Sequence, residues 1–263
     1  MPAKEAEKFA DSTLMEGMTS IKAVISSFEA GISDRRVKRV MADSEKAGAK
    51  PRDMAYLYEK SKKFGFPIEL VSKDVIDEMT VGNSHGGIIA ETTERTIEEI
   101  SAEKISPDGF YVFLQGIEDP YNFGYCLRSL YAAGVSGVVL ERRNWMSAAG
   151  VVCRASAGAS ELMPLFCGDT QEIVSSFKKN GYMIVAADKD KKAVSVYDTE
   201  LRFPLLLVVG GERRGITKEM LMSCDKTVML DYGREFRAAL SAASASSIIA
   251  FEIFRKNRRG GDI

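Results

Sequence analysis

The stretch "FPLLLVVGGERRGIT", residues 203–217, decides the fold class. Its apolar run, residues 205–209, has the composition of a strand that is buried on both faces of a sheet. Two glycines, a glutamate, two arginines and a further glycine follow, and this composition predicts a turn. In open α/β sheets ligands bind beyond the carboxyl ends of the strands, so this loop is a candidate site.

Strand and helix patterns alternate on both sides of this stretch, which indicates an α/β fold with a mostly parallel sheet. The chain after it continues with a strand at 227–233 and closes with a long helix at 238–259. The elements predicted before it are strands at 110–116, 136–141 and 182–188 and helices within 119–134, 147–159 and 170–181. The loops after residues 115, 209 and 230 are therefore the informative ones.

A smaller α/β/α module is predicted ahead of this part of the chain. Its strands are predicted at 37–43, 67–72 and 86–92, and its helices at 18–31, 52–65 and 73–80. The polar segment "TERTIEEISAEKISPDG" follows and has no strong apolar period. We therefore predict a first domain at 1–93, a linker at 94–107 and a second domain at 108–263.

The composition is that of a soluble globular protein: 263 residues, 45% hydrophobic and 28% charged. No run approaches the roughly 18 apolar residues of a membrane span, and the charged N-terminus lacks the apolar core of a signal peptide. The four cysteines are scattered without a CxxC pair, which argues against a zinc site and a disulfide framework. We expect a cytoplasmic protein.

Charge is unevenly distributed although the net charge of the chain is −1. Residues 35–63 contain ten lysines and arginines against four acidic residues, and a basic segment, "RKNRR", lies near the C-terminus. Such runs either contact nucleic-acid phosphates or form solvated helix faces, and both interpretations stay open.

The loop "VVGGERRGI", residues 208–216, matches neither GxGxxG nor the P-loop spacing, which disfavours a dinucleotide or a P-loop phosphate. A structural turn and a ligand loop are equally compatible with its pattern. The loop "DPYNFGYCLR", residues 119–128, carries turn residues at Asn122 and Gly124. Arg128 follows them on a helix, where it either holds a phosphate or hydroxyl or forms a salt bridge to a carboxylate such as that of Glu212.

The third stretch, "DYGREFRAALSAASASSIIAFE" (231–252), is rich in alanine and serine, which permits close helix packing. The single histidine, His85, lies in the first module. A Ser-His-Asp triad and histidine-based metal clusters at these loops are therefore excluded.

The ordered set of motifs resembles the SpoU/TrmH-type RNA methyltransferases of the SPOUT superfamily. "NFGYCLRSLYAAG" (122–134) is similar to their first motif and "VVGGERRGI" to their second, with "CRASAGASELMPLF" (153–166) similar to the segment between them. The resemblance covers about residues 108–258. It implies a C-terminal trefoil knot and a homodimer that builds each active site at the subunit interface.

The resemblance also implies the residues of the site. The cofactor would be S-adenosylmethionine (AdoMet), no metal would be needed, and the helix at the third motif would complete the site. The implied catalytic residues are Asn122, Arg128, Glu212 and Ser241, and the implied cofactor-binding residues are Gly210, Gly211, Leu230 and Leu240.

Two further parts of the chain bear on this resemblance. The first module is similar to the ribosomal-protein-like substrate-binding domain of the family, in which His85 would support a turn or touch RNA. The third motif departs from the family pattern, because residues 239–241 replace Ser-Leu-Asn and Gly233 requires an insertion. Arg234 and Arg237 are the residues expected to compensate.

The resemblance implies methyl transfer from AdoMet to a ribose 2′-hydroxyl of structured RNA, with ribosomal RNA (rRNA) preferred and transfer RNA (tRNA) possible. Such in-line transfer depends mainly on positioning. Arg128 would orient the target ribose through its phosphate and help to lower the pKa of the hydroxyl. The alternative is a non-catalytic RNA-binding adaptor that retains the fold, for which the altered third motif is the argument.

Overall fold

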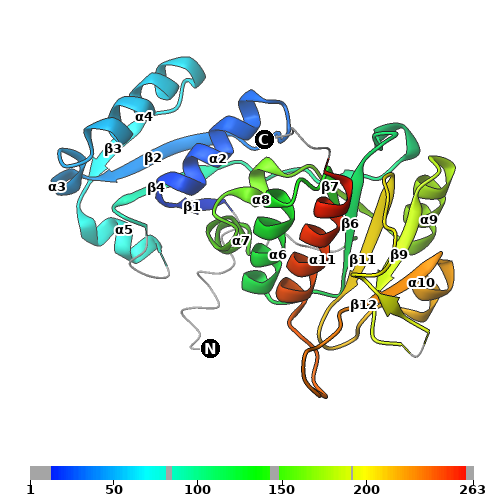
Figure 1. The fold of residues 1–263 in the computed structure, drawn as a ribbon. Coiled ribbons are helices and arrows are strands. Elements are labelled where there is room, and N and C mark those ends of the chain that lie inside the picture. Colours follow the sequence, from blue (N-terminus) through cyan, green and yellow to red (C-terminus); the bar gives the residue numbers. More distant parts are fainter. Residues whose placement is uncertain (1–12, 81–84, 143–147, 191, 259–263) are drawn as a thin grey trace. The chain divides into compact units, whose positions relative to one another are not determined.

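The computed structural model describes residues 13–80, 85–142, 148–190 and 192–258, which divide into two compact units (Figure 1). The first unit contains the described residues of Met1–Thr96 and Asn144–Leu162. The second contains those of Ile97–Arg143 and Met163–Ile263. This division differs from the predicted domains, because part of the predicted linker belongs to the second unit and residues 148–162 belong to the first. Residues 147 and 259, at the ends of predicted helices, lie outside the described residues.

The first unit is built on a four-stranded mixed sheet in the order β1-β4-β2-β3. β4 runs antiparallel to both β1 and β2, whereas β2 and β3 are parallel. The strands are β1 (Leu14–Glu16), β2 (Val37–Asp43), β3 (Ile68–Val71) and β4 (Ile88–Thr92). The helices of the N-terminal segment are α2 (Gly17–Glu29), α3 (Ser44–Ala47), α4 (Pro51–Phe64) and α5 (Lys73–Met79).

Two helices from later in the sequence, α7 (Ala149–Ala155) and α8 (Ala159–Leu162), complete the first unit. Glu161 of α8 is buried there against Arg35, with its Oε2 3.2 Å from the Arg35 Nε. Ser27 of α2 donates a hydrogen bond of 2.5 Å to the Glu161 carbonyl. A buried ion pair of this kind joins segments that are far apart in the sequence, which explains why sequence patterns placed residues 148–162 elsewhere.

His85 has a structural position in the first unit. It is 3% exposed, and its Nδ1 accepts a hydrogen bond of 3.0 Å from the Gly87 backbone. Its Nε2 lies 3.1 Å from the Asp77 Oδ1. The ring therefore supports the turn before β4, one of the two roles expected for it.

The second unit is built on an eight-stranded sheet in which every strand pair is parallel. The order is β10-β12-β9-β11-β6-β7-β8-β5. The strands are β5 (Glu98–Glu99), β6 (Phe110–Gln115), β7 (Gly137–Glu141), β8 (Leu165–Gly168), β9 (Met183–Ala187), β10 (Val194–Ser195), β11 (Leu205–Gly210) and β12 (Lys226–Met229). The predicted α/β class with a mostly parallel sheet is confirmed, and the stretch that decided it forms the interior strand β11.

Both faces of this sheet are covered by helices, as its continuous apolar strands require. α9 (Thr170–Lys179) and α10 (Lys218–Ser223) pack on the face that carries Phe113 and Val208. α6 (Pro120–Ala132) and α11 (Ala242–Asn257) pack against each other and cover the opposite face (Figure 1). A short 3₁₀ helix, η1 (Ala102–Lys104), lies before β6. The short strands β1, β5, β8 and β10 were not predicted, because two to four residues carry too little periodicity.

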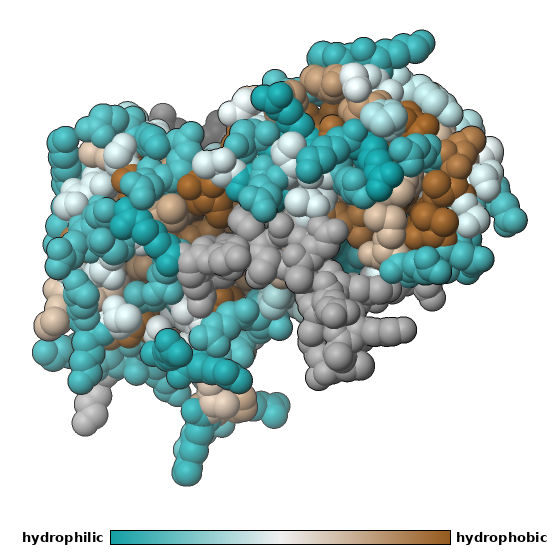
Figure 2. All heavy atoms as spheres, turned by 180° about the vertical axis from the view of Figure 1, so that it is seen from behind, coloured by the Kyte–Doolittle hydropathy of each residue, from teal (hydrophilic) through white to brown (hydrophobic). Residues whose placement is uncertain are grey.

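Polar and charged side chains cover most of the surface in Figure 2, and apolar patches interrupt them. Among the described residues, no helix is long and apolar enough to cross a membrane.

Candidate active site

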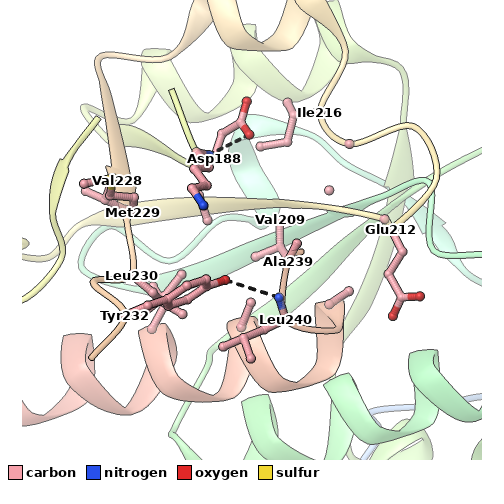
Figure 3. Close-up of a pocket in the computed structure, with 18 residues that line it drawn as sticks. Asp188, Val209, Glu212, Ile216, Val228, Met229, Leu230, Tyr232, Ala239 and Leu240 are labelled. Carbon is pink, nitrogen blue, oxygen red and sulfur yellow. Dashed lines mark hydrogen bonds between the residues drawn. The ribbon is translucent and has the colours of Figure 1, made fainter. Parts of the chain in front are cut away.

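A pocket lies at the carboxyl ends of β9, β11 and β12, in a volume of about 230 Å³ (Figure 3). Its walls are formed by the ends of these three strands, the loop after β11 and the first turns of α11. The lining residues at and after the strand ends include Ala187, Asp188, Lys189, Gly210, Gly211, Glu212, Leu230 and Tyr232, and those before and within α11 include Ala239, Leu240, Ala242 and Ala245. This is the edge at which parallel sheets bind ligands.

Close backbone packing at the end of β11 requires glycine at positions 210 and 211. A Cβ on Gly210 would lie 2.4 Å from the Gly215 carbonyl carbon, and one on Gly211 would lie 2.1 Å from the Gly116 carbonyl oxygen. Gly215 donates a 2.9 Å hydrogen bond to the Gly211 carbonyl and closes the loop. The structural turn that the pattern left open is therefore present, and the same turn forms part of the pocket wall.

A second pocket of about 520 Å³ adjoins the first and shares Glu212 and Ala242 with it. It is lined by the loop after β6, residues 116–120, and by Asn122 and Arg213. The Asn122 Nδ2 donates a hydrogen bond of 3.4 Å to the Glu212 Oε1, which links the first and second motifs across 90 residues of sequence. In Figure 3, Glu212 lies at the end of the first pocket away from Val228 and Met229.

Buried Gln115 connects the loops after β6 and β11 by hydrogen bonds. Its Oε1 accepts a hydrogen bond of 2.9 Å from the Thr217 backbone, and its Nε2 lies 3.3 Å from the Glu141 Oε1. The Gly116 backbone also donates to the Glu141 carboxylate, at 3.3 Å. A fully packed amide of this kind fixes both loops that line the second pocket.

A cysteine nucleophile is disfavoured in this unit. Burial raises the pKa of Cys126 on α6 to about 11 and that of Cys224 to about 12. Both side chains are therefore thiols at neutral pH, whereas the nucleophilic form is the thiolate. Among the described residues, no group of three or more His, Cys, Asp and Glu side chains gathers as a metal site would.

Family profiles match both parts of the chain. The SpoU rRNA Methylase family matches residues 109–251, which is more than half of the sequence. The chain belongs to the SpoU rRNA methylase family. A second profile, described as RNA 2′-O ribose methyltransferase substrate binding, matches residues 17–97.

Individual relatives agree with this family. The chain is 28% identical over 218 residues to the 23S rRNA (guanosine-2′-O-)-methyltransferase RlmB of Shewanella oneidensis, covering 80% of this chain and 87% of that one. It is 26% identical over 237 residues to the putative TrmH family tRNA/rRNA methyltransferase YacO of Bacillus subtilis, covering 88% and 92% of the two chains.

Solved structures show the same fold. The SpoU methyltransferase AviRb of Streptomyces viridochromogenes, in complex with AdoMet, superposes with a TM-score of 0.75 at 17% identity, over 97% of this chain and 99% of that one. A crystal structure of an RNA 2′-O ribose methyltransferase superposes with a TM-score of 0.75 at 22% identity, over 97% and 96%.

The four residues predicted to bind AdoMet, Gly210, Gly211, Leu230 and Leu240, all line the first pocket. Their role in the family's reaction stays a prediction, and their gathering around one pocket is the geometry that the role requires. Sequence reasoning missed Asp188, Lys189 and Tyr232. Asp188 ends the predicted strand "YMIVAAD" and Lys189 follows it, but only the sheet order places β9 beside β11 and β12.

The residues of the first pocket fit AdoMet. Val209, Ile216 and Leu240 offer apolar surface for a flat adenine, and the half-buried Asp188 offers a carboxylate to ribose hydroxyls or an ammonium group. The Tyr232 hydroxyl accepts a hydrogen bond of 3.2 Å from the Leu240 backbone, which closes the wall before α11 (Figure 3).

The predicted catalytic residues are only partly brought together. Asn122 and Glu212 are joined by the hydrogen bond described above. Arg128 is exposed on α6, lines neither pocket and forms no ion pair within the described residues, so the alternative salt bridge to Glu212 is absent. Ser241 lines neither pocket and is the N-cap of α11, where its hydroxyl accepts a hydrogen bond of 3.1 Å from the Ser244 backbone.

We expect Ser241→Ala to lower the free energy of unfolding of the second unit by about 0.5–2 kcal/mol, because the cap of α11 is lost. Ser241→Asn, which keeps a capping side chain, should restore most of that stability. Both variants should retain the rate of methyl transfer at a temperature at which they are folded. A rate that falls in Ser241→Ala while the protein stays folded would give the hydroxyl a role in the reaction instead.

Gly211→Ala is expected to destabilise the second unit by at least the 1–3 kcal/mol typical of overpacked sites, since the new Cβ meets a backbone carbonyl that cannot rotate away. Thermal denaturation measures the loss. Gly233→Ala is the matched control, because nothing lies within 4 Å of its added Cβ. A Gly211→Ala protein as stable as the wild type would show that the loop can move away from Gly116.

Proposed function

We propose that the protein transfers a methyl group from AdoMet to a ribose 2′-hydroxyl of rRNA. The observation that carries this proposal is a pair of adjoining pockets that share Glu212 and Ala242, in a chain of the SpoU rRNA methylase family. The first pocket takes the methyl donor and the second takes the ribose. rRNA is favoured over tRNA because relatives named as 23S rRNA methyltransferases cover most of the chain.

AdoMet supplies an activated methyl group, so this chain's residues have to position the acceptor and exclude water. Asn122 and Glu212 hold the loops after β6 and β11 around the second pocket through their hydrogen bond. Arg128 is proposed to bind the phosphate of the target nucleotide, a role for which a guanidinium is suited by its charge and its fork of donors. Nothing in this scheme requires a metal.

The active site is proposed to be completed by a second copy of this chain. α6 and α11 lie side by side and expose apolar side chains away from the sheet: Tyr125 is 48% exposed on α6, and Ile248 and Phe251 are 40% and 46% exposed on α11. Arg128 is exposed on the same helix as Tyr125, three residues further on. A homodimer that covers this face would also enclose Arg128.

The first unit is proposed to contact the RNA. Some residues of its basic run make contacts within the unit and are not available to RNA. Arg35 is buried, and Lys60 and Lys63 both bind Glu29, at 2.8 and 2.7 Å. These two lysines lower the pKa of Glu29 through their hydrogen bonds. The exposed cations that remain, Arg36, Arg52 and Lys62 among them, are available to phosphates.

The trefoil knot, the cytoplasmic location and the independence from metal stay predictions. The adaptor alternative is distinguished from the enzyme by chemistry alone, because both would bind RNA. It would have to explain why Asn122 and Glu212 are kept in contact beside a pocket that fits AdoMet.

The test is calorimetric titration with AdoMet, followed by transfer of a labelled methyl group to unmethylated 23S rRNA and to tRNA transcripts. Saturable binding and label in a ribose 2′-O-methyl of rRNA are expected. AdoMet and RNA binding without transfer would establish the adaptor, and label in tRNA alone would change the substrate. Sedimentation velocity of the same sample measures whether the protein is a dimer.

A further inference from the structure

The segment between β12 and α11, residues 231–240, forms an arm that projects from the second unit, seen as the orange-red loop at the bottom of Figure 1. All of its residues except Tyr232 and Leu240 are exposed. Phe236 is 52% exposed, and the side chain of Arg237 is 95% exposed. An aromatic ring held in solvent between two arginines, Arg234 and Arg237, does not serve the core of this unit.

The base of the arm is fixed at the rim of the first pocket. Tyr232, Ala239 and Leu240 line the pocket, and the hydrogen bond from the Leu240 backbone to the Tyr232 hydroxyl joins the two ends of the arm (Figure 3). Lys189, which lines the same pocket, donates a hydrogen bond of 3.3 Å to the Phe236 carbonyl. The arm is therefore an ordered extension of the pocket wall.

The Phe236 ring is held in a defined place. Its centroid lies 6.0 Å from that of Tyr232 at a tilted angle, and the Lys189 ammonium lies 5.4 Å from the Tyr232 ring. Phe236 is nevertheless half exposed to solvent. An exposed aromatic ring that is held in place, with arginines close to it in the sequence, is what proteins use to stack an unpaired nucleic-acid base and bind the neighbouring phosphates.

We propose that Phe236 stacks an unpaired base that flanks the target nucleotide of the RNA, while Arg234 and Arg237 bind the adjoining phosphates. This inference rests on the proposed function, since it places the base next to a ribose held at the methyl donor. The arm would thereby select RNA in which the nucleotide beside the target is unpaired. It would also give a binding role to the stretch in which this chain departs from the pattern of its family's third motif.

The charge of the arm favours RNA as its binding partner. The only carboxylates on the arm are those of Asp231, which accepts a hydrogen bond from Ser195, and Glu235, which lies 4.0 Å from Arg237 in full solvent. An exposed pair of that kind holds an arginine weakly, so a phosphate can replace the carboxylate. In single-stranded RNA, bases alternate with phosphates along the chain. A ring with an arginine on either side in the sequence can therefore stack a base while the arginines bind the phosphates next to it.

The direct test is fluorescence of a short oligouridylate that carries one 2-aminopurine, titrated with the full-length protein. Stacking on Phe236 should quench the fluorescence in the wild type and in Phe236→Tyr, and Phe236→Ala should lose the quenching. Met222→Ala is the control, because Met222 is 82% exposed on α10 and outside the arm. Quenching that survives in Phe236→Ala would overturn the proposal.

Steady-state methylation of 23S rRNA transcripts gives the second measurement. Phe236→Ala should raise the KM for RNA roughly 5- to 150-fold, since stacking on an aromatic side chain contributes that much per base. The Kd for AdoMet should stay within about twofold, because the ring does not line the pocket. An unchanged KM for RNA would contradict the proposal. A higher Kd for AdoMet would instead assign the arm to cofactor binding, and a wild-type dimer that dissociates in Phe236→Ala would assign the arm to the contact between subunits. The fluorescence titration needs no turnover, so it still decides the proposal if the protein fails to methylate RNA.

Discussion

Replacing Arg128 with alanine should lower the rate of methyl transfer about 10²–10³-fold and leave the affinity for AdoMet within about twofold of wild type. The guanidinium is exposed on α6 without an ion pair in the described residues, so its charge is available to a phosphate. It lines neither pocket, so its removal should not disturb the methyl donor. Single-turnover methylation of rRNA and calorimetric titration with AdoMet measure the two quantities separately.

Two further variants sharpen this test. Arg128→Lys keeps the charge but loses the two-pronged donor geometry, and its rate should fall between those of the wild type and Arg128→Ala. Arg142→Ala removes an arginine whose guanidinium binds Glu172 at 2.8 Å, away from both pockets, and should leave the rate unchanged. A normal rate in Arg128→Ala would remove this residue from the mechanism, and weaker AdoMet binding would reassign it to the cofactor.

Glu161→Gln should lower the free energy of unfolding of the first unit by about 3–5 kcal/mol, the loss expected when one partner of a buried ion pair is removed. Glu161 and Arg35 are 3% and 0% exposed. Burial also lowers the pKa of Arg95, and the charge of Glu161 acts against that shift. Without the carboxylate, the buried Arg95 guanidinium would lose the charge that most offsets its burial and its repulsion by Arg35. Urea denaturation followed by circular dichroism measures the loss.

Glu69→Gln is the control in the same unit. Its carboxylate lies 3.3 Å from the Arg39 guanidinium, but both side chains are partly exposed, at 37% for Arg39 and 43% for Glu69, and Arg39 keeps its bond to Glu91. This change should leave the stability unaltered within error. Equal stability of Glu161→Gln and Glu69→Gln would show that residues 148–162 do not hold the first unit together.

The candidate site was predictable where its residues follow strong local patterns. Gly210 and Gly211 follow a continuous apolar strand, so their place at a sheet edge could be inferred from sequence. Asp188 could not be placed in the same way, because the neighbours of β9 in the sheet are set by long-range pairing. The catalytic role implied for Ser241 stays a prediction, and only the structure shows that its hydroxyl also caps α11.

The sequence by itself determined the α/β class, the parallel sheet and the order of the three motifs, because period and turn residues act within about twenty residues of each other. Only the tertiary structure decided that residues 148–162 belong to the first unit. The contacts responsible join Arg35 and Ser27 to Glu161, and no local pattern records partners so far apart. Likewise, the hydrogen bond between Asn122 and Glu212 and the merging of two pockets at Glu212 exist only once β6 and β11 pair side by side.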